Sequence, residues 1–316
     1  MPPKKLTSIE VCAGAGGQAV GLEMAGFRHL ACVEIDRDAC QTIQMNRPRW
    51  LVEQTDVRDW SWDGSAPVDL LAGGVPCPPF SVAGQQLGED DERDLFPEML
   101  RLVDEIRPGA VMIENVKGLL TARFAPYREQ ILAELDSMGY SGEWKLLQAA
   151  DFGVPQLRPR SILVALPHAD FTTFAWPSPL PTQTSVGDAL LPIMEREGWP
   201  GAQEWASRAD GVAPTLVGGS RKHGGADLGP TRAKAEWLRR FGVDARGLAD
   251  APPAKGHTGL PRLTVEMAAI LQGFPHDWQF SGRKTSAYRQ VGNAFPPPVA
   301  AAVGRQIAKA LRARRP

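Results

Sequence analysis

Strand-like and helix-like patterns alternate along the first 166 residues of the chain. Short segments dominated by apolar residues predict strands at 8–12, 29–33, 68–72, 110–113 and 161–166. Helical periodicity separates them, through residue 24 and over 37–46, 95–106 and 127–138. Strands that alternate with helices pair in parallel, so we expect an α/β fold with a doubly wound, mainly parallel, Rossmann-like sheet.

The pattern changes after Pro167. Residues 168–260 are rich in Gly, Pro, Trp and Ser and show weak periodicity, which predicts a smaller irregular lobe or a long insertion. Helical patterns return over 264–271 and 298–311, and we expect the last helix to fold back onto the first domain.

Composition places the chain among soluble globular proteins, with 43% hydrophobic and 22% charged residues. No apolar run is long enough to span a bilayer, and no signal-peptide core follows the first five residues, which predicts a cytoplasmic protein without a membrane partner. The cysteines at 12, 32, 40 and 77 lack metal-ligand spacing, so we expect reduced thiols and no metal.

The charge is unevenly distributed although the net charge is only −1. Residues 201–316 hold 18 Lys plus Arg against 8 Asp plus Glu, a net +10, while residues 1–200 carry a net −11. A basic last third suggests a polyanionic partner, and a solvated basic face with a basic tail explains the same charges.

Glycines and carboxylates cluster where the first strands should end. A glycine turn, C-A-G-A-G-G at 12–17, follows the first strand, and Glu34 and Asp56 end the next two. This pattern suits a nucleoside ligand without a pyrophosphate, and S-adenosylmethionine fits it better than NAD. A tight turn without a ligand and ordinary surface carboxylates remain the alternative interpretation.

Further motifs follow in a fixed order: P-C-P-P-F-S at 76–81, E-N-V at 114–116, Q-L-R-P-R at 156–160, L-Q-G-F-P at 271–275 and G-N-A at 292–294. In this order, and across nearly the whole chain, the motifs resemble those of bacterial-type DNA (cytosine-5)-methyltransferases. The resemblance implies a Rossmann-like methyltransferase fold, S-adenosyl-L-methionine as methyl donor, S-adenosyl-L-homocysteine as product, and double-stranded DNA as partner.

The resemblance also assigns the chemistry of the reaction. Cys77, held between prolines, would attack C6 of cytosine so that C5 can accept a methyl group. Glu114 would contact N3 and the exocyclic amine, and Arg160 the O2 atom. Asn115 would orient the loop through backbone hydrogen bonds, and Arg158 would contact a phosphate or a loop. Taken singly, the cysteine suits a buried core thiol and the charged groups suit a strand edge.

By the same resemblance, Gly14 and Gly16 line the methionine portion of the donor, Glu34 binds the ribose and Asp56 the adenine amine. Cys12 and Ile35 stand where the family usually has aromatic residues beside the adenine, so less stacking is expected. The remaining implied cofactor contacts are Gly17, Val57, Gly74, Pro76, Leu95, Asn293 and Ala294.

The family flips the target cytosine out of the duplex, because C6 cannot be reached inside it. The implied division is a catalytic domain of residues 1–167 plus 262–316 and a target-recognition domain of residues 168–261. The expected DNA-binding residues are Ser81, Gln156, Arg221, Lys222, Arg232 and Lys234.

Three functions remain open at this point. The first is a monomeric DNA cytosine-5 methyltransferase of a restriction-modification or related defence system, with a separately encoded cognate restriction endonuclease as implied partner. The second is a tRNA enzyme with the same chemistry, although the Cys-Phe-Thr signature of that branch is absent because no cysteine follows position 77. The third is a non-catalytic DNA-binding module, which intact Cys77, Glu114 and Arg160 disfavour.

Overall fold

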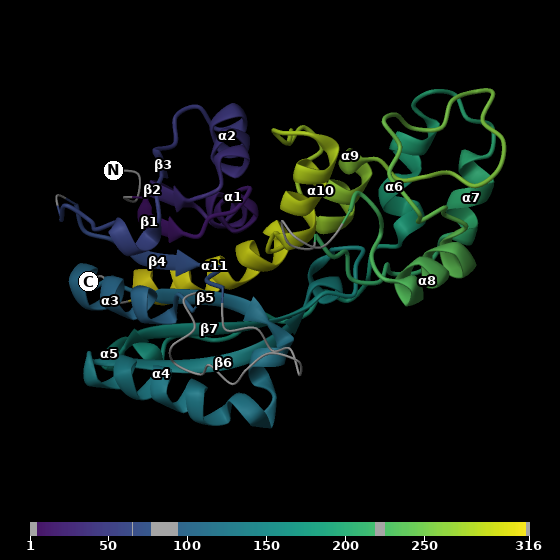
Figure 1. Ribbon diagram of the computed structural model, residues 1–316. Helices are drawn as coiled ribbons and strands as arrows, with labels where there is room; N and C mark the ends of the chain where they lie inside the picture. The colour runs from purple at the N-terminus through teal and green to yellow at the C-terminus, as the bar shows by residue number, and fades with distance from the viewer. Residues whose placement is uncertain (1–4, 65, 77–93, 219–224, 314–316) are drawn as a thin grey trace.

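A seven-stranded sheet forms the centre of the computed structural model, which describes residues 5–64, 66–76, 94–218 and 225–313 (Figure 1). The strand order is β3-β2-β1-β4-β5-β7-β6. The strands are β1 (Leu6–Val11), β2 (Phe27–Glu34), β3 (Val52–Gln54), β4 (Leu70–Gly73), β5 (Val111–Val116), β6 (Tyr140–Gln148) and β7 (Pro159–Pro167). Strand order reverses between β1 and β4, and a ligand site is expected at the carboxyl ends of the strands there.

The neighbours from β3 to β5 all pair in parallel, which confirms the predicted α/β class with a mainly parallel sheet. β7 pairs antiparallel with both β5 and β6, so the expectation that residues 161–166 continue the parallel series was wrong. β6 was not predicted at all. It is an edge strand whose side chains are mostly exposed or half-buried, and it therefore lacks the apolar run that marks the inner strands.

Helices cover both faces of the sheet (Figure 1). One face is packed by α3 (Phe96–Ile106) and α4 (Ala125–Ser137) through side chains such as Met99 and Leu135. The other is packed by α1 (Gly17–Met24) and α11 (Pro297–Ala313), with Leu22 and Val303 in one apolar cluster. Further helices are α2 (Arg37–Asn46), α5 (His168–Phe171) and the 3-10 turns Val57–Asp59, Lys117–Leu120, Ala122–Phe124 and Ala149–Phe152.

The last described helix lies directly on the first. A side chain at Gly21 of α1 would place its Cβ 2.4 Å from the Pro297 carbonyl oxygen and 2.5 Å from the Ala300 Cβ. Only glycine permits this approach, which brings α11 onto the domain formed by the first strands. The expectation that the final helix folds back is therefore confirmed.

The second lobe contains more regular structure than its sequence suggests. It includes α6 (Val186–Glu195), α7 (Ala202–Arg208) and α8 (Thr231–Phe241), and α9 (Val265–Gln272) and α10 (Lys284–Asn293) join it to the sheet domain (Figure 1). Trp205 and Trp237 of the lobe share one apolar cluster with Met267 of α9 and Val291 of α10. The division at residues 167 and 262 remains a prediction, and the packing adds that α9 and α10 share the core of the lobe.

None of the helices in the described ranges combines the length and the apolar character needed to cross a membrane.

Candidate functional site

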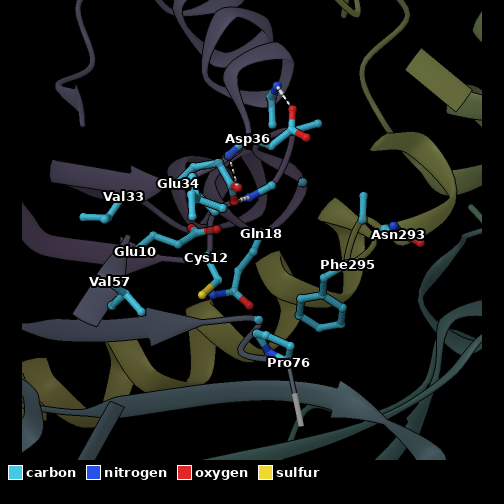
Figure 2. A pocket seen from close by; sticks show the side chains of 18 of the residues that line it. Glu10, Cys12, Gln18, Val33, Glu34, Asp36, Val57, Pro76, Asn293 and Phe295 are labelled. Carbon is cyan, nitrogen blue, oxygen red and sulfur yellow. Dashed lines mark hydrogen bonds between the residues drawn. The ribbon is translucent and has the colours of Figure 1, made fainter. Parts of the chain in front are cut away.

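A cavity of about 670 Å³ lies at the carboxyl ends of β1, β2, β4 and β5, beside the start of α1 (Figure 2). Among the residues predicted to contact the methyl donor, those that line it are Cys12, Gly14, Gly17, Glu34, Ile35, Asp56, Val57, Gly74, Pro76, Leu95, Asn293 and Ala294. The fold thus brings together residues that lie up to 282 positions apart in the sequence.

The Glu34 carboxylate organises the glycine turn at one side of the cavity. Its Oε2 accepts a hydrogen bond of 2.7 Å from the Gly14 N–H, and its Oε1 accepts one of 2.7 Å from the Asp36 N–H. Gly14 has a φ of +54°, a backbone conformation that favours glycine. Burial raises the pKa of Glu34, and the backbone donors oppose that rise by stabilising the charged form.

Gly16 does not line the cavity, unlike the other predicted contacts. A Cβ at this position would lie 3.1 Å from Ile43 Cγ1 and 3.2 Å from Trp278 Cζ2, so the residue faces α2 and the segment between α9 and α10. Its neighbour Gly17 does line the cavity, and a Cβ there would lie 2.5 Å from the Phe295 carbonyl oxygen. Gly16 therefore shapes the turn through packing, and its contact with the methionine portion of the donor stays a prediction, since its neighbours Ala15 and Gly17 line the cavity.

Asp56 and Ile35 lie where the resemblance places the adenine. Asp56 accepts hydrogen bonds from Arg58 Nη2 at 2.6 Å and Nε at 3.0 Å, and these bonds lower its pKa. Ile35 is 61% exposed, so this wall of the cavity is aliphatic and open. Cys12 has a φ of +52°, and burial, followed by the charges of Glu34 and Asp56, raises the pKa of its thiol.

Two buried polar side chains at the cavity were not predicted. Glu10 is 1% exposed and Gln18 is 3% exposed. Glu10 Oε2 and both amide atoms of Gln18 have no hydrogen-bond partner in the described part of the chain. Burial raises the pKa of Glu10, the Ala19 N–H lowers it, and the charge of Glu34 raises it further. For Glu10 the sequence signal was a carboxylate within the apolar run predicted as the first strand, whereas Gln18 follows two glycines and carries no such signal.

Glu114 and Arg160 form an ion pair at the edge of the cavity. Arg160 Nε lies 2.7 Å from Glu114 Oε1, and the two side chains are 12% and 11% exposed. Burial raises the pKa of Glu114, while the charges of Arg160 and Arg158 oppose that rise. The predicted catalytic carboxyl and the predicted O2 contact therefore lie together, and burial makes this carboxyl easier to protonate than an ordinary glutamate.

Asn115 connects this pair to the segment that precedes Cys77. Its Nδ2 donates a hydrogen bond of 2.9 Å to the Val75 carbonyl, and its Oδ1 accepts one of 2.8 Å from the Val116 N–H. Nearby, a Cβ at Gly74 would lie 3.4 Å from Glu114 Oε2. These contacts hold the segment that ends at Pro76 against the carboxyl end of β5.

Arg158 is buried, and the prediction of a phosphate contact was wrong for this residue. It is 1% exposed, which leaves no path to a phosphate, and its guanidinium donates to three carbonyl oxygens. Nη1 bonds to Leu216 at 2.8 Å, and Nη2 bonds to Gly292 at 2.7 Å and Ala294 at 3.0 Å. Burial lowers the pKa of Arg158 well below its usual value. The predicted loop contact is the alternative that the structure supports.

Gln156 is also buried, so the expectation that it binds DNA was wrong. Its Nε2 donates to the Leu271 carbonyl at 3.0 Å and to Gln272 Oε1 at 2.7 Å, and its Oε1 accepts from the Leu216 N–H at 2.9 Å. Gln272 in turn donates to the Ala294 carbonyl. We call Gln156, Arg158 and Gln272 the interlobe joint, because they connect β7, the loop at 216, α9 and the cavity wall at 292–294.

Several predicted residues lie outside the described ranges, namely Cys77, Ser81, Arg221 and Lys222. Of the other predicted DNA contacts, Arg232 is exposed at the start of α8. Lys234 is half-buried and donates to Asp227 Oδ2 at 2.8 Å.

Other residues that line the cavity were not predicted, and most of them lie next to predicted residues in the sequence. They are Ala13, Ala15, Val33, Asp36, Ala39, Thr55, Arg58, Arg289, Gln290 and Phe295. Within the described ranges, no group of three or more His, Cys, Asp or Glu is placed to hold a metal ion.

Comparison with known proteins adds independent findings. The model of the family "C-5 cytosine-specific DNA methylase" matches residues 6–309. Among curated proteins, Type II methyltransferase M.NaeI of Lentzea aerocolonigenes is 54% identical, covering 98% of this chain and 76% of the relative. Type II methyltransferase M.NgoMIV of Neisseria gonorrhoeae is 53% identical, covering 98% and 99%.

Solved structures share the fold at lower sequence identity. An Escherichia coli prophage protein described as a DNA modification methyltransferase superposes with a TM-score of 0.70 at 24% identity, covering 97% of this chain and 99% of the other. The Dnmt2 methyltransferase of S. pombe has a TM-score of 0.65 at 17% identity, covering 98% and 99%.

Proposed function

Because the chain belongs to the C-5 cytosine-specific DNA methylase family, we propose that it methylates C5 of a flipped-out cytosine at one short site in duplex DNA. The methyl donor in this proposal is S-adenosyl-L-methionine, which supplies an electrophilic methyl group and leaves as S-adenosyl-L-homocysteine. No metal takes part in the proposed reaction.

The residues at the cavity fit this donor. Glu34 has a fixed carboxylate at the tip of β2, where ribose hydroxyls can bind it, and Asp56 lies at the neighbouring strand end. The partnerless polar atoms of Glu10 and Gln18 match a ligand that carries its own donors and acceptors. The aliphatic wall at Ile35 would cover the adenine without aromatic stacking.

The proposed chemistry begins with Cys77, whose thiolate sulfur forms a bond to C6 of the cytosine. Glu114, protonated at least transiently, would hydrogen-bond N3 and so stabilise the charge that the attack places on the ring. Arg160 would hold O2. Once C5 has received the methyl group, loss of the C5 proton expels the thiolate from C6 and restores the aromatic ring.

The observation that carries the proposal is that Pro76, Glu114 and Glu34 line one cavity. Cys77 directly follows Pro76 in the chain, so the proposed nucleophile, base-binding carboxyl and donor-binding carboxylate belong to one site. The raised pKa of Glu114 further supports the proposal, because a protonated carboxyl can donate a hydrogen bond to N3 of the cytosine.

We assign base reading to the lobe at 168–261, with Arg221, Lys222, Arg232 and Lys234 as DNA contacts. Since the relatives at 53–54% identity are named Type II methyltransferases, we further propose a restriction-modification role, with a separate endonuclease as partner. In this proposal the enzyme acts as a cytoplasmic monomer. The tRNA alternative has less support, because no cysteine follows position 77 and the Cys-Phe-Thr signature of that branch is therefore absent.

The nucleophile is tested by Cys77→Ser with labelled methyl donor and duplex DNA. The variant should bind the donor normally but transfer no methyl group, while Cys40→Ser, at a buried thiol on α2, should retain activity. A duplex with 5-fluorocytosine at the target should form a stable adduct with the wild type, since fluorine cannot leave as a proton does. Wild-type turnover by Cys77→Ser would contradict the mechanism.

The substrate is tested by methylome sequencing of cells that express the chain, with genomic DNA and bulk tRNA compared as acceptors in vitro. We expect 5-methylcytosine at one short duplex motif, where each wrong base pair costs about 1–3 kcal/mol. Arg232→Ala should also reduce the salt dependence of DNA binding by about one unit of log–log slope if it contacts a phosphate. Labelling of tRNA without labelling of DNA would favour the RNA enzyme instead.

A further inference from the structure

Glu10 and Gln18, which we call the cavity floor, are buried side chains with polar atoms that have no hydrogen-bond partner among the described residues. Gln18 is the second residue of α1, and neither Nε2 nor Oε1 finds a partner among the described residues. Glu10, also at the cavity, uses one side of its carboxylate for the Ala19 N–H and leaves Oε2 without a partner. Buried amides are nearly always hydrogen-bonded in folded proteins, so this pair requires an explanation.

We propose that the Gln18 side chain binds the amino-acid end of the methyl donor, with Nε2 donating to its carboxylate and Oε1 accepting from its ammonium group. This inference rests on the proposed function. Glu10, which lines the same cavity, is the proposed negative group for the ammonium.

The position of Gln18 separates it from the groups that suit the ribose and adenine. Figure 2 shows Gln18 between Cys12 and Phe295 and above Pro76, while Glu34 lies beside Asp36, farther from Pro76. Pro76 precedes the proposed nucleophile, so Gln18 lies on the side of the cavity nearest the reacting carbon. In the donor, the sulfonium that carries the methyl group joins the adenosine to the amino-acid end.

The chemistry of the site fits a zwitterion better than a neutral group. A primary amide offers both donors and acceptors, so one side chain can serve a carboxylate and an ammonium together. The start of α1 favours a carboxylate through the positive end of the helix dipole. The nearby charges of Glu10 and Glu34 favour a cation on their side.

The test compares two ligands by isothermal titration calorimetry. S-adenosyl-L-homocysteine carries the amino-acid end, and 5′-methylthioadenosine lacks it but keeps the adenosine and the sulfur. Gln18→Met keeps the side-chain volume and removes the amide. We expect this variant to bind S-adenosyl-L-homocysteine about 10- to 100-fold more weakly, because it loses hydrogen bonds to charged groups. Its affinity for 5′-methylthioadenosine should equal that of the wild type.

Thermal unfolding without ligand supplies a second readout. Gln18→Met should unfold at the same or a higher temperature, because the amide has no described protein partner to lose. Gln18→Leu repeats the test if the methionine variant folds poorly. Gln130→Met, at an exposed position on α4, is the matched control and should change neither affinity.

The outcomes separate this inference from the function on which it rests. A wild type that binds S-adenosyl-L-homocysteine tightly, with Gln18 variants that bind it equally well, overturns the role of Gln18 alone. Equal weakening of both ligands also overturns it, because the amide would then act on the adenosine or on the fold. A wild type that binds neither ligand overturns the proposed function together with this inference.

Discussion

The interlobe joint and the cavity floor are two clusters of buried polar groups with opposite hydrogen-bond states. In the joint, Gln156 and Gln272 bond to each other and to backbone groups, and Arg158 bonds to backbone carbonyls, so that among the described residues only its Nε lacks a partner. At the cavity floor, Glu10 and Gln18 leave most of their capacity open within the described residues. The two clusters are nevertheless equally buried.

This difference teaches how to separate structural from ligand-binding polar residues when both occur in motifs. A satisfied buried network stabilises one arrangement of the chain, and its residues are costly to remove. An unsatisfied group costs stability unless a ligand completes it. The motif Q-L-R-P-R contributes to both places, with Gln156 and Arg158 in the joint and Arg160 paired with Glu114 at the cavity edge.

The largest expected effect is at Arg158. Replacing it with methionine leaves the carbonyls of Leu216 and Gly292 without this donor, at about 1–3 kcal/mol each, while removal of a buried cation recovers part of the cost. We expect the free energy of unfolding to fall by about 2–4 kcal/mol, measured by urea denaturation.

Arg305→Met, at an exposed position on α11, is the control for Arg158 and should change stability by less than about 0.5 kcal/mol. Normal stability of Arg158→Met together with weaker DNA binding would restore the phosphate contact and break the comparison.

A smaller loss is expected for Gln156→Leu. The Leu216 N–H and the Leu271 carbonyl lose their side-chain partner inside the protein, which should reduce the free energy of unfolding by about 1–3 kcal/mol. The salt dependence of DNA binding should stay at the wild-type value, because a buried amide makes no phosphate contact. A changed salt slope with intact stability would identify Gln156 as an interface residue after all.

The smallest effect, and the only expected gain, is at Glu10. Because burial raises its pKa, the folded protein binds the proton more tightly than the unfolded chain does. The stabilisation by protonation is fully present below the usual carboxyl pKa and is lost as the pH rises through the raised value. Glu10→Gln, which stays neutral, should therefore be more stable than wild type by about 1 kcal/mol at pH 8.

That gain should shrink on acidification from pH 8 toward pH 4, as the wild-type carboxyl becomes protonated. Urea denaturation at several pH values measures it, with the exposed Glu129→Gln on α4 as control. A gain that grows on acidification, or a loss at every pH, would show that Glu10 is stabilised as an anion by the protein itself.

The sequence predicts those parts of the fold in which a pattern of apolar and polar residues is compatible with only one local structure. Residues 37–46 form α2 with the predicted bounds, because Asp36 accepts from the Asp38 and Ala39 N–H groups and so fixes the first turn. Strand direction could not be predicted in the same way. Periodicity reports which face is buried, and β7 is buried equally well whether it runs parallel or antiparallel.

The candidate site shows the same limit. Glu34 and Glu114 could be predicted because strand ends in such a sheet converge on one edge. The sequence could not show that Gln156 is buried while Arg160 lies at the cavity edge, although only four positions separate them. Gln156 is held by α9 and the loop at 216, whereas Arg160 pairs with Glu114 on β5, and these partners lie far apart in the sequence. Gln18 was missed because a glutamine after two glycines is equally typical of an ordinary helix start.

Because α11 packs directly on α1, the cavity can be completed only after the last part of the chain has been synthesised. Residues 293–295 line the cavity together with residues from 10 to 18, and α11 covers the sheet face next to α1. While these late segments are still inside the exit tunnel, the first strands expose an apolar face and have no complete cavity for a nucleoside. Nascent chains halted before residue 290 should therefore depend on chaperones and gain no protection from the methyl donor, whereas chains released after α11 should gain it.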